Sequence, residues 1–295
     1  MNVGRLNNNM TTAEIQAPVA NNGGGGNRRK MELMTVQSSA FRILVEALRE
    51  LLTDTIMEFD ENGMKVMTTD TSRTVLVHLW IDGSRCESYR CDSKVSIGVS
   101  MNELHKLVKA ITNNDTLTLF LEENDMNHLG IKIENFEKNA RTELRLRLLD
   151  LGHEKLAADP MKFDSVITLP SADFQKICRD MNQLGVEVVE IKDVQNQLIF
   201  SCNGEFCSQE TVLYDKKNGM YNIGQKKSAH DIVQGVFSLK FLLMFTKCTN
   251  LCNTVELMLK NDFPLVVRYG VASLGEIKLC LAQQLDEAAP TFDMP

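Results

Sequence analysis

The sequence predicts an α+β protein of two similar domains, each with antiparallel strands on one side and two helices on the other. Two observations predict this fold class. A helical segment recurs four times along the 295 residues, each time after a serine-containing turn and with apolar residues at three- and four-residue spacing. A pair of segments with alternating apolar and polar residues follows each helix, which is typical of half-buried antiparallel strands.

The four copies pair into two halves. The predicted helices are residues 40–52, 101–112, 172–184 and 239–249, each with a serine placed to cap its first turn. The predicted strands are 63–67, 75–79, 117–121, 129–133, 186–191, 198–200, 255–259 and 265–269. The first copy matches the third, with Phe41 against Phe174. The second matches the fourth, where Leu104, Lys109 and Leu117 align with Leu242, Lys247 and Val255.

The domain boundaries follow from composition. Residues 1–30 are rich in Asn, contain the run Gly23–Gly26 and predict a disordered tail. The tail ends in Arg28-Arg29-Lys30, which fits a solvated linker end or a short contact with DNA or an import receptor. We expect a first domain at 31–148, a polar linker at 149–164, a second domain at 165–285 and a flexible tail at 286–295.

Composition argues against several protein classes. Hydrophobic residues are 43% and charged residues 24%, as in soluble globular proteins, and no apolar run approaches the length of a membrane span. The eight cysteines form no CxxC pair and lack histidines at zinc spacing, so we expect reduced thiols, no metal and no cofactor. The five histidines are scattered, and no phosphate-binding glycine loop follows a strand. We therefore expect no enzyme, an expectation that measurable turnover of nucleotides would overturn.

Basic residues recur on the same face of all four predicted helices. Each helix carries a pair separated by three or seven residues, spacings that place both side chains on one side. The four helices sum to a net charge of +3, so the remainder of the chain, whose total is -7, carries -10. One such pair is usually an ordinary solvated face, but four pairs at matching places favour an anionic partner.

Helix packing indicates what such a basic face could surround. Helices pack 8–10 Å apart, so four in a circle enclose only ~13 Å and twelve enclose ~35 Å. A DNA duplex is roughly 20 Å across. Three copies of the chain could therefore enclose a duplex with clearance, and one copy could not. Two copies would enclose ~25 Å, which this arithmetic does not exclude.

Five segments carry a resemblance to a known family. They are LVEALREL at 44–51, ESYRCD at 87–92, FQKICRDMNQLG at 174–185, FTKCT at 245–249 and DFPLVVRYG at 262–270. With these segments the chain resembles the proliferating cell nuclear antigen (PCNA) family of eukaryotic-type DNA sliding clamps over residues 31–285. The resemblance implies the DNA clamp fold in a ring-shaped homotrimer, with sheets outside and helices inside, around double-stranded DNA. It also implies loading by an ATP-dependent clamp loader and recruitment of DNA polymerase and other enzymes through PIP-box peptides.

The resemblance places three groups of residues. By this resemblance, eight basic residues would contact DNA phosphates loosely and without sequence preference: Arg42, Arg49, Lys106, Lys109, Lys176, Arg179, Lys240 and Lys247. The partner-peptide groove would include Thr69, Thr74, Leu76, Leu156, Phe163, Pro264, Leu281 and Ala282. The subunit interface would join two edge strands through Glu143, Leu144, Arg145, Leu146, Arg147, Val212, Leu213 and Tyr214.

The sequence departs from the family pattern at several of these places. Thr69, Thr74 and Cys280 stand where the family usually has Met, Val and an aromatic residue, so the groove is expected to be more polar and changed in shape. The loop at 215–230 is rich in Lys where the family is acidic, which fits a solvated loop or an added contact with DNA or a partner.

Two further interpretations stay open. The chain could be one subunit of a heteromeric checkpoint-type clamp, or an oligomeric scaffold that does not enclose DNA. The same residues fit a cellular protein of the nucleus or a protein of a large DNA virus, for which a cytoplasmic replication site is the alternative.

Overall fold

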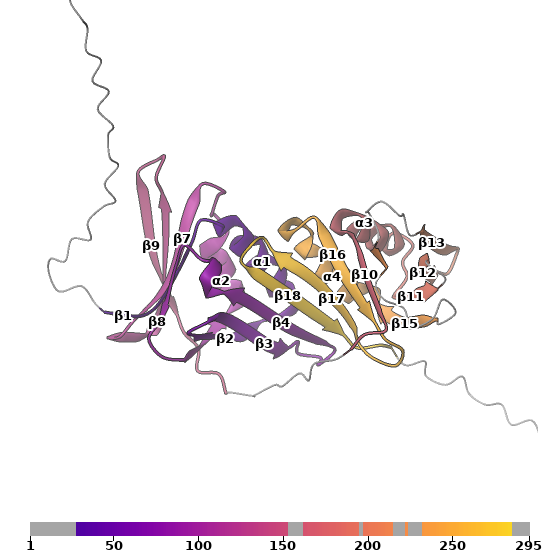
Figure 1. The fold of residues 1–295 in the computed structure, drawn as a ribbon, viewed down its shortest axis with the longest axis horizontal. Coiled ribbons are helices and arrows are strands. Elements are labelled where there is room, and N and C mark those ends of the chain that lie inside the picture. Colours follow the sequence, from indigo (N-terminus) through magenta and orange to yellow (C-terminus); the bar gives the residue numbers. More distant parts are fainter. Residues whose placement is uncertain (1–27, 153–161, 195–196, 215–221, 224–231, 285–295) are drawn as a thin grey trace, which may run out of the picture.

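The computed structural model describes residues 28–152, 162–194, 197–214, 222–223 and 232–284 (Figure 1). Most of the predicted N-terminal tail, linker, Lys-rich loop and C-terminal tail lie outside these residues. Arg29 and Lys30, assigned to the tail, instead begin strand β1 (Arg29–Thr35). The Arg29 guanidinium lies 4.3 Å from the ring centre of Phe120 and 2.7 Å from a Glu32 carboxylate oxygen, so its charge is engaged within the fold.

The described elements repeat the predicted order of helix and strands. The first half contains β1, α1 (Ser38–Leu51), β2 (Asp54–Asp60), β3 (Gly63–Thr69), β4 (Val75–Asp82), the 3-10 helix η1 (Gly83–Arg85), β5 (Ser88–Cys91), β6 (Val95–Ser100), α2 (Met101–Val108), β7 (Asp115–Glu122), β8 (Asp125–Asn135) and β9 (Ala140–Arg147). The second half contains β10 (Ser165–Pro170), α3 (Ser171–Asn182), β11 (Val188–Val194), β12 (Gln197–Asn203), β13 (Ser208–Tyr214), β14 (Asn222–Ile223), β15 (Val233–Ser238), α4 (Leu239–Phe245), the 3-10 helix η2 (Thr246–Leu251), β16 (Thr254–Leu259), β17 (Leu265–Val271) and β18 (Gly275–Leu281).

Two predicted helices are shorter than expected. Helix α2 ends at Val108, with Lys109 as its C-terminal cap, and the chain then turns into β7. Helix α4 ends at Phe245 and continues as η2, where the Thr246 hydroxyl donates to the carbonyl of Leu243 over 2.7 Å. A threonine that bonds back to the preceding turn disturbs regular helix geometry, which fits the change of helix type at this residue.

The predicted serine caps are only partly right: Ser100 and Ser238 occupy the N-cap positions of α2 and α4, but their hydroxyls do not cap the helices. None of the four α-helices in the described chain has a side-chain hydrogen bond at its N-cap. Ser38 and Ser171 instead occupy the first helical position and donate their hydroxyls to backbone carbonyls that follow the other helical segment of the same domain. Ser38 bonds to the carbonyl of Asp115 over 2.6 Å, and Ser171 bonds to that of Cys252 over 2.6 Å. The matched serines therefore tie two helical segments together in each domain.

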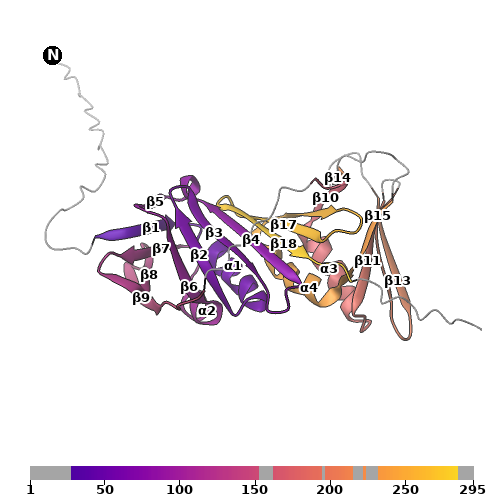
Figure 2. The same ribbon diagram turned by 90° about the horizontal axis from the view of Figure 1, so that it is seen from below.

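The strands form three antiparallel sheets. A five-stranded sheet has the order β5-β1-β7-β8-β9, and a four-stranded sheet has the order β13-β12-β11-β15. The third sheet has nine strands, β14-β10-β16-β17-β18-β4-β3-β2-β6, and joins the two domains through β18 and β4. Figures 1 and 2 show the five- and four-stranded sheets at opposite ends of an elongated molecule.

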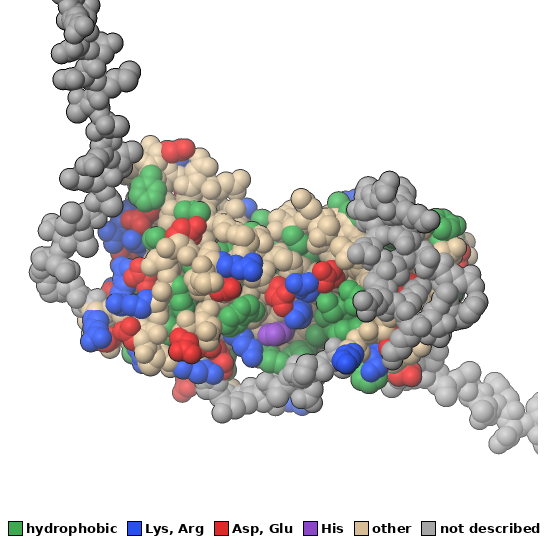
Figure 3. All heavy atoms as spheres, viewed as in Figure 1, with side chains coloured by type: hydrophobic (Ala, Val, Ile, Leu, Met, Phe, Trp, Pro, Cys, Tyr) green, Lys and Arg blue, Asp and Glu red, His purple; other side chains and the backbone are tan. Residues whose placement is uncertain are grey.

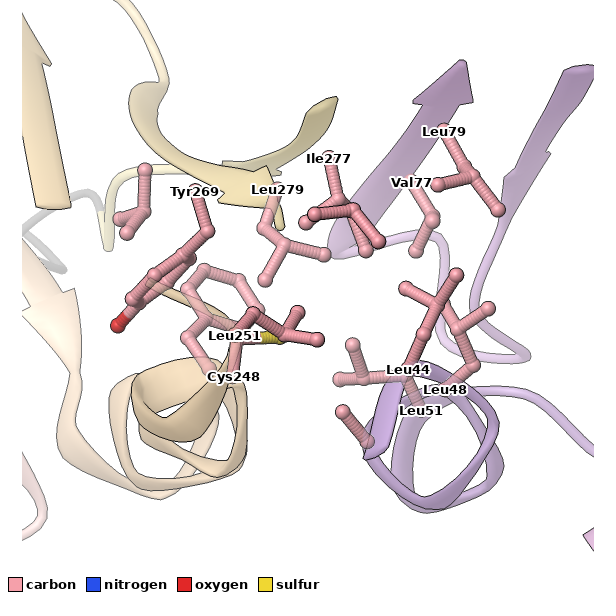
Figure 4. Close-up of a cluster of buried hydrophobic side chains, with 14 of the residues drawn as sticks. Leu44, Leu48, Leu51, Val77, Leu79, Cys248, Leu251, Tyr269, Ile277 and Leu279 are labelled. Carbon is pink, nitrogen blue, oxygen red and sulfur yellow. The ribbon is translucent and has the colours of Figure 1, made fainter. Parts of the chain in front are cut away.

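A continuous core lies between the nine-stranded sheet and the helices. Helix α1 buries Leu44, Leu48 and Leu51 towards this core, and η2 contributes Cys248 and Leu251. Figure 4 shows these side chains meeting Val77, Leu79, Tyr269, Ile277 and Leu279 from β4, β17 and β18. The core runs through the domain boundary because the sheet above it does. The helices thus form one layer, and their other faces point away from the sheet.

Candidate nucleic-acid interface and partner surfaces

The exposed face of the helical layer carries all eight predicted basic residues. The buried positions of each helix face the sheet, so the intervening exposed positions form the opposite surface. Lys106, Lys109, Lys176, Arg179, Lys240 and Lys247 are exposed. Arg42 and Arg49 are less open, with side chains 29% and 35% exposed.

The basic groups of α1 and α2 are close enough to affect one another. The pKa of His105 lies below its ordinary value of 6.5, first because the imidazole is partly desolvated and then because Arg49 repels its proton. Lys109 and Arg42 act in the same direction, and Glu46 opposes them. His105 is therefore mainly neutral at pH 7, and the positive charge here comes from its Arg and Lys neighbours.

Acidic side chains partly offset the charge of α1. Arg42 lies 3.9 Å from Glu46, and Arg49 lies 3.4 Å from Glu50. Both pairs reach the solvent, where such contacts contribute little and both partners stay available to water and salt. The exposed faces of α2, α4 and η2 hold more lysines than carboxylates, so they carry most of the net positive charge.

The outer face of the nine-stranded sheet carries a row of apolar side chains. The strand register places Met258, Val266, Cys280 and Leu76 side by side, followed by Thr69. Figure 3 shows apolar side chains gathered on this face beside charged ones. The next row holds Arg268, whose guanidinium lies 2.7 Å from Glu256 and 2.8 Å from Glu276. We call the residues from Met258 to Thr69 the apolar row. Ion pairs of Arg268 border it.

The partner-peptide residues fall around this apolar row, with one correction. Thr69, Thr74, Leu76, Phe163 and Ala282 are half-buried and Pro264 is exposed. Leu281 is 0% exposed because it shares the alternation of the core residues Ile277 and Leu279. Leu281 therefore supports the surface from below and does not line it. Leu156 lies outside the described residues.

Met258 and Val266 were missed in the sequence, although their signal was present. Both alternate with core residues of β16 and β17, so they had to face outwards. Only the register, which pairs Val266 with Cys280, brings them beside Leu76. Val266 is also 7% exposed, so it fills the floor of the row and does not project from it.

The turn between β3 and β4 fixes one end of the apolar row. The Asp70 carboxylate accepts hydrogen bonds from the amides of Ser72, Thr74 and Val75. Partial burial raises the pKa of Asp70, but a hydrogen bond from the Ser72 hydroxyl, together with these amide bonds, outweighs burial and lowers the pKa below its ordinary value. The amide of Ala282 donates to the carbonyl of Thr74 over 3.0 Å, which fastens the end of β18 to the same turn.

The two predicted interface strands are both sheet edges in the described structure. β9 is the last strand of the five-stranded sheet, and β13 is the last of the four-stranded sheet. On β9, Glu143, Arg145 and Arg147 are exposed, Leu144 is half-buried and Leu146 is buried. Arg145 lies 3.1 Å from Glu122 and 3.0 Å from Asp125. On β13, Val212 and Leu213 are half-buried, and Tyr214 is 61% exposed.

The described residues contain neither a cluster of metal ligands nor a disulfide. No group of three or more His, Cys, Asp or Glu residues among them could hold a metal ion. All eight cysteines are free thiols, and burial raises the pKa of Cys178 and Cys248 to about 12. No helix in the described part of the chain is long and apolar enough to cross a membrane.

The sequence matches two domain models of one protein family and a viral relative. Residues 30–155 match the family model of the proliferating cell nuclear antigen N-terminal domain, and residues 158–284 match that of the C-terminal domain. The chain is also 29% identical over 253 residues to the "Probable DNA polymerase sliding clamp 1" of Paramecium bursaria Chlorella virus 1, over 85% of this chain and 95% of that protein. The two family matches together cover nearly all of the described chain. The chain therefore belongs to the proliferating cell nuclear antigen family of DNA sliding clamps.

Proposed function

We propose that three copies of this chain close into a ring around double-stranded DNA and hold DNA polymerase and other replication and repair enzymes on it. The proposal assigns the chain no catalytic step. The observation that carries it is the pairing of β18 with β4, which joins a five-stranded and a four-stranded group into one sheet.

The same joint can form between copies. The two other sheets also have five and four strands, and they end at β9 and β13. When β9 of one copy pairs with β13 of the next, a second nine-stranded sheet forms between chains. Because the two edges lie at opposite ends of the molecule, the contact is head-to-tail and generates a closed ring when the rotation fits.

The internal repeat also supports one register for that contact. Within the chain, Ile277 of β18 lies opposite Leu79 of β4. Strand β7 matches β16 in the repeat. The strand pairs that lead from β7 to β9 correspond to those that lead from β16 to β18, and they make Thr142 the counterpart of Ile277. Strands β6 and β15 also match, because they precede α2 and α4. The strand pairs that lead from β6 to β4 correspond to those that lead from β15 to β13, and they make Thr211 the counterpart of Leu79. Thr142 of one copy should therefore face Thr211 of the next.

The helical layer suits the inside of such a ring. Three copies supply twelve helical segments, which enclose ~35 Å at ordinary packing distances and leave room for water around a duplex of roughly 20 Å. Long basic side chains can contact phosphates of any sequence without fixing the protein in one register. The acidic remainder of the chain discourages DNA from binding outside the ring.

The apolar row on the outer sheet face is the surface we assign to partners. A short peptide of the PIP-box type can place apolar anchors on Leu76 and its neighbours while its polar residues meet the adjacent ion pairs. The side chains of Thr69 and Cys280 are smaller and more polar than the residues that the family usually has at these positions, so they change the shape and polarity of this surface. We also assign loading to an ATP-dependent clamp loader. The ring acts in the nucleus, or in a cytoplasmic replication site if its genome is viral.

Encirclement has a topological test. After loading with a clamp loader, we expect the ring to stay on a closed circular plasmid through a salt wash and to be lost within minutes once one restriction cut makes the plasmid linear. Equal retention on both forms would contradict encirclement. Native mass measurement of the purified chain decides its assembly: a homotrimer is expected, and a monomer that assembles only with other chains would favour the heteromeric clamp.

A further inference from the structure

The inner helical layer contains an apolar hollow that the binding of DNA does not explain. Its volume is about 500 Å³, and it lies between the C-terminal end of α3 and the segment formed by α4 and η2. Val186, Leu243 and Met244 contribute apolar surface, and Lys240 and Lys247 border them. Asn182, Glu187 and Ser238 also line the hollow, so its charged side chains are two ammonium groups and one carboxylate. DNA phosphates could bind the two ammonium groups, but the apolar surface between these groups makes no favourable contact with a phosphate.

The fold does not require apolar residues at these positions. The internal repeat aligns Leu242 and Lys247 with Leu104 and Lys109 of α2. The residues that match Leu243 and Met244 are therefore His105 and Lys106, which are polar and partly or fully exposed. The same place in the same layer is thus basic in one domain and apolar between two lysines in the other. This difference points to an occupant with both apolar and acidic groups.

One segment of the chain with this composition begins at the hollow. Gln284 lines it, and the amide of Gln284 donates to the carbonyl of Val236 over 2.9 Å, which fixes the point from which the chain continues. Residues 285–295 follow, with the sequence LDEAAPTFDMP. The segment contains three carboxylates, no basic residue, and the apolar side chains Leu285, Phe292 and Met294. Eleven extended residues span at most about 36–40 Å, so every part of the segment can reach the hollow.

We propose that residues 285–295 dock in this hollow, with their apolar side chains against Leu243 and Met244 and their carboxylates beside Lys240 and Lys247. The attachment at Gln284 makes the contact intramolecular, so a weak interaction suffices to occupy the site for much of the time. When docked, the segment covers two of the eight basic groups assigned to DNA. That consequence rests on the proposed function, whereas the docking does not.

Lysine footprinting without DNA tests the docking directly. The full-length chain is treated with a limiting amine-acetylating reagent and compared with the full-length variant Asp286→Asn, Glu287→Gln, Asp293→Asn. We expect Lys240 and Lys247 to be acetylated at least threefold faster in the variant. Lys106 and Lys109, at the matching face of the other domain, should react equally in both chains. Equal rates for Lys240 and Lys247 in the two chains would overturn the proposal.

Two further measurements separate the alternative occupants. Carbodiimide coupling of the wild-type chain should join Asp286 or Glu287 to Lys240 or Lys247 of the same molecule. Exclusively intermolecular products in a mixture of isotope-labelled and unlabelled chains would show a second copy in the hollow and refute intramolecular docking. Phe292→Ser should raise the acetylation of Lys240 at least twofold although no charge changes. An unchanged rate would refute the apolar half of the contact. None of these results depends on whether the ring encloses DNA.

Discussion

Gln37 and Ser273, which are 236 residues apart in sequence, exchange two hydrogen bonds across the domain boundary. The Gln37 side-chain amide donates to the Ser273 hydroxyl over 2.6 Å, and the Ser273 backbone amide donates to the Gln37 side-chain carbonyl over 3.0 Å. Gln37 precedes α1, and the residue at the same place before α3 is Pro170, which has no side-chain amide. The joint within the chain therefore has a fastening for which the proposed joint between chains has no equivalent glutamine.

Removing this fastening should weaken the chain without dissociating the ring. Gln37→Ala removes both bonds, and we expect the free energy of unfolding to fall by about 1–2 kcal/mol, since each exposed hydrogen bond contributes roughly 1 kcal/mol or less. Urea denaturation at one fixed protein concentration measures the change. Gln234→Ala, an exposed glutamine of β15, serves as the control and should change the midpoint much less. A matching loss of stability in both variants would deny the pair a specific role.

Cysteine cross-linking tests the register between copies. Directly opposed residues of antiparallel strands have Cα atoms roughly 4.5–5.5 Å apart, a distance that a disulfide spans. Mild oxidation of the variant Thr142→Cys, Thr211→Cys should therefore give covalent dimers and trimers on non-reducing gels. Neither single variant should do so. The variant Thr142→Cys, Gln209→Cys is displaced by two residues and should cross-link much more slowly. Faster cross-linking of the displaced pair would refute the register.

The salt dependence of DNA binding tests the helical surface. We expect Lys106→Glu with Lys109→Glu to lower retention on DNA and stimulation of polymerase at least tenfold while the trimer stays intact. If both lysines contact phosphates, the slope of log affinity against log salt concentration should also fall by about 2, since each phosphate contact contributes close to one unit. Arg90→Glu with Lys94→Glu makes the same charge change on β5 and the loop after it. If the two variants had equal effects, the change in net charge alone would explain the result, and the assignment of DNA binding to the helical surface would be wrong.

Much of the fold was predictable because its signals are local. Helical spacing located α1 and α3 to within two residues, and alternation located strands such as β7 and β16. The pairing of β18 with β4 was not predictable, because it joins residues about 200 positions apart and depends on the register of a whole sheet. The serine caps failed for a related reason: Ser38 found a better acceptor in the carbonyl of Asp115, which only the tertiary fold brings near.

The candidate sites divide in the same way. The basic helix residues could be assigned to one layer because helical periodicity separates the exposed face from the buried one. Leu281 was placed on the peptide surface by family resemblance, against an alternation with Ile277 and Leu279 that already assigned it to the core. The neighbours of Leu76 required the register between strands, which no single segment of sequence contains.

An acidic residue in the apolar row should block partner peptides. Leu76→Glu places a carboxylate beside Cys280, where an apolar peptide anchor would have to desolvate it. We expect the affinity for a PIP-box peptide, measured by fluorescence anisotropy, to fall at least tenfold, and Leu156→Ala to weaken it as well. Val188→Glu makes the same kind of change at a half-buried position of β11 in another sheet and should leave affinity unchanged. Full peptide affinity in the Leu76 variant would move the peptide site elsewhere.

The titration of His105 reports directly on the charge around it. Its pKa lies below 6.5 through partial desolvation first and repulsion by Arg49 next. As pH falls below 6.5, the unfolded chain takes up this proton before the folded one, so His105 lowers stability with falling pH in that interval. In NMR titrations, Arg49→Gln should raise the pKa of His105, whereas Glu46→Gln should lower it further because Glu46 stabilises the protonated ring. A bound duplex should raise the pKa, since phosphates near the ring favour its charged form. If neither substitution changed the pKa of His105, desolvation alone would determine it. The basic residues of α1 and α2 would then not be close enough to act together on one strand of DNA.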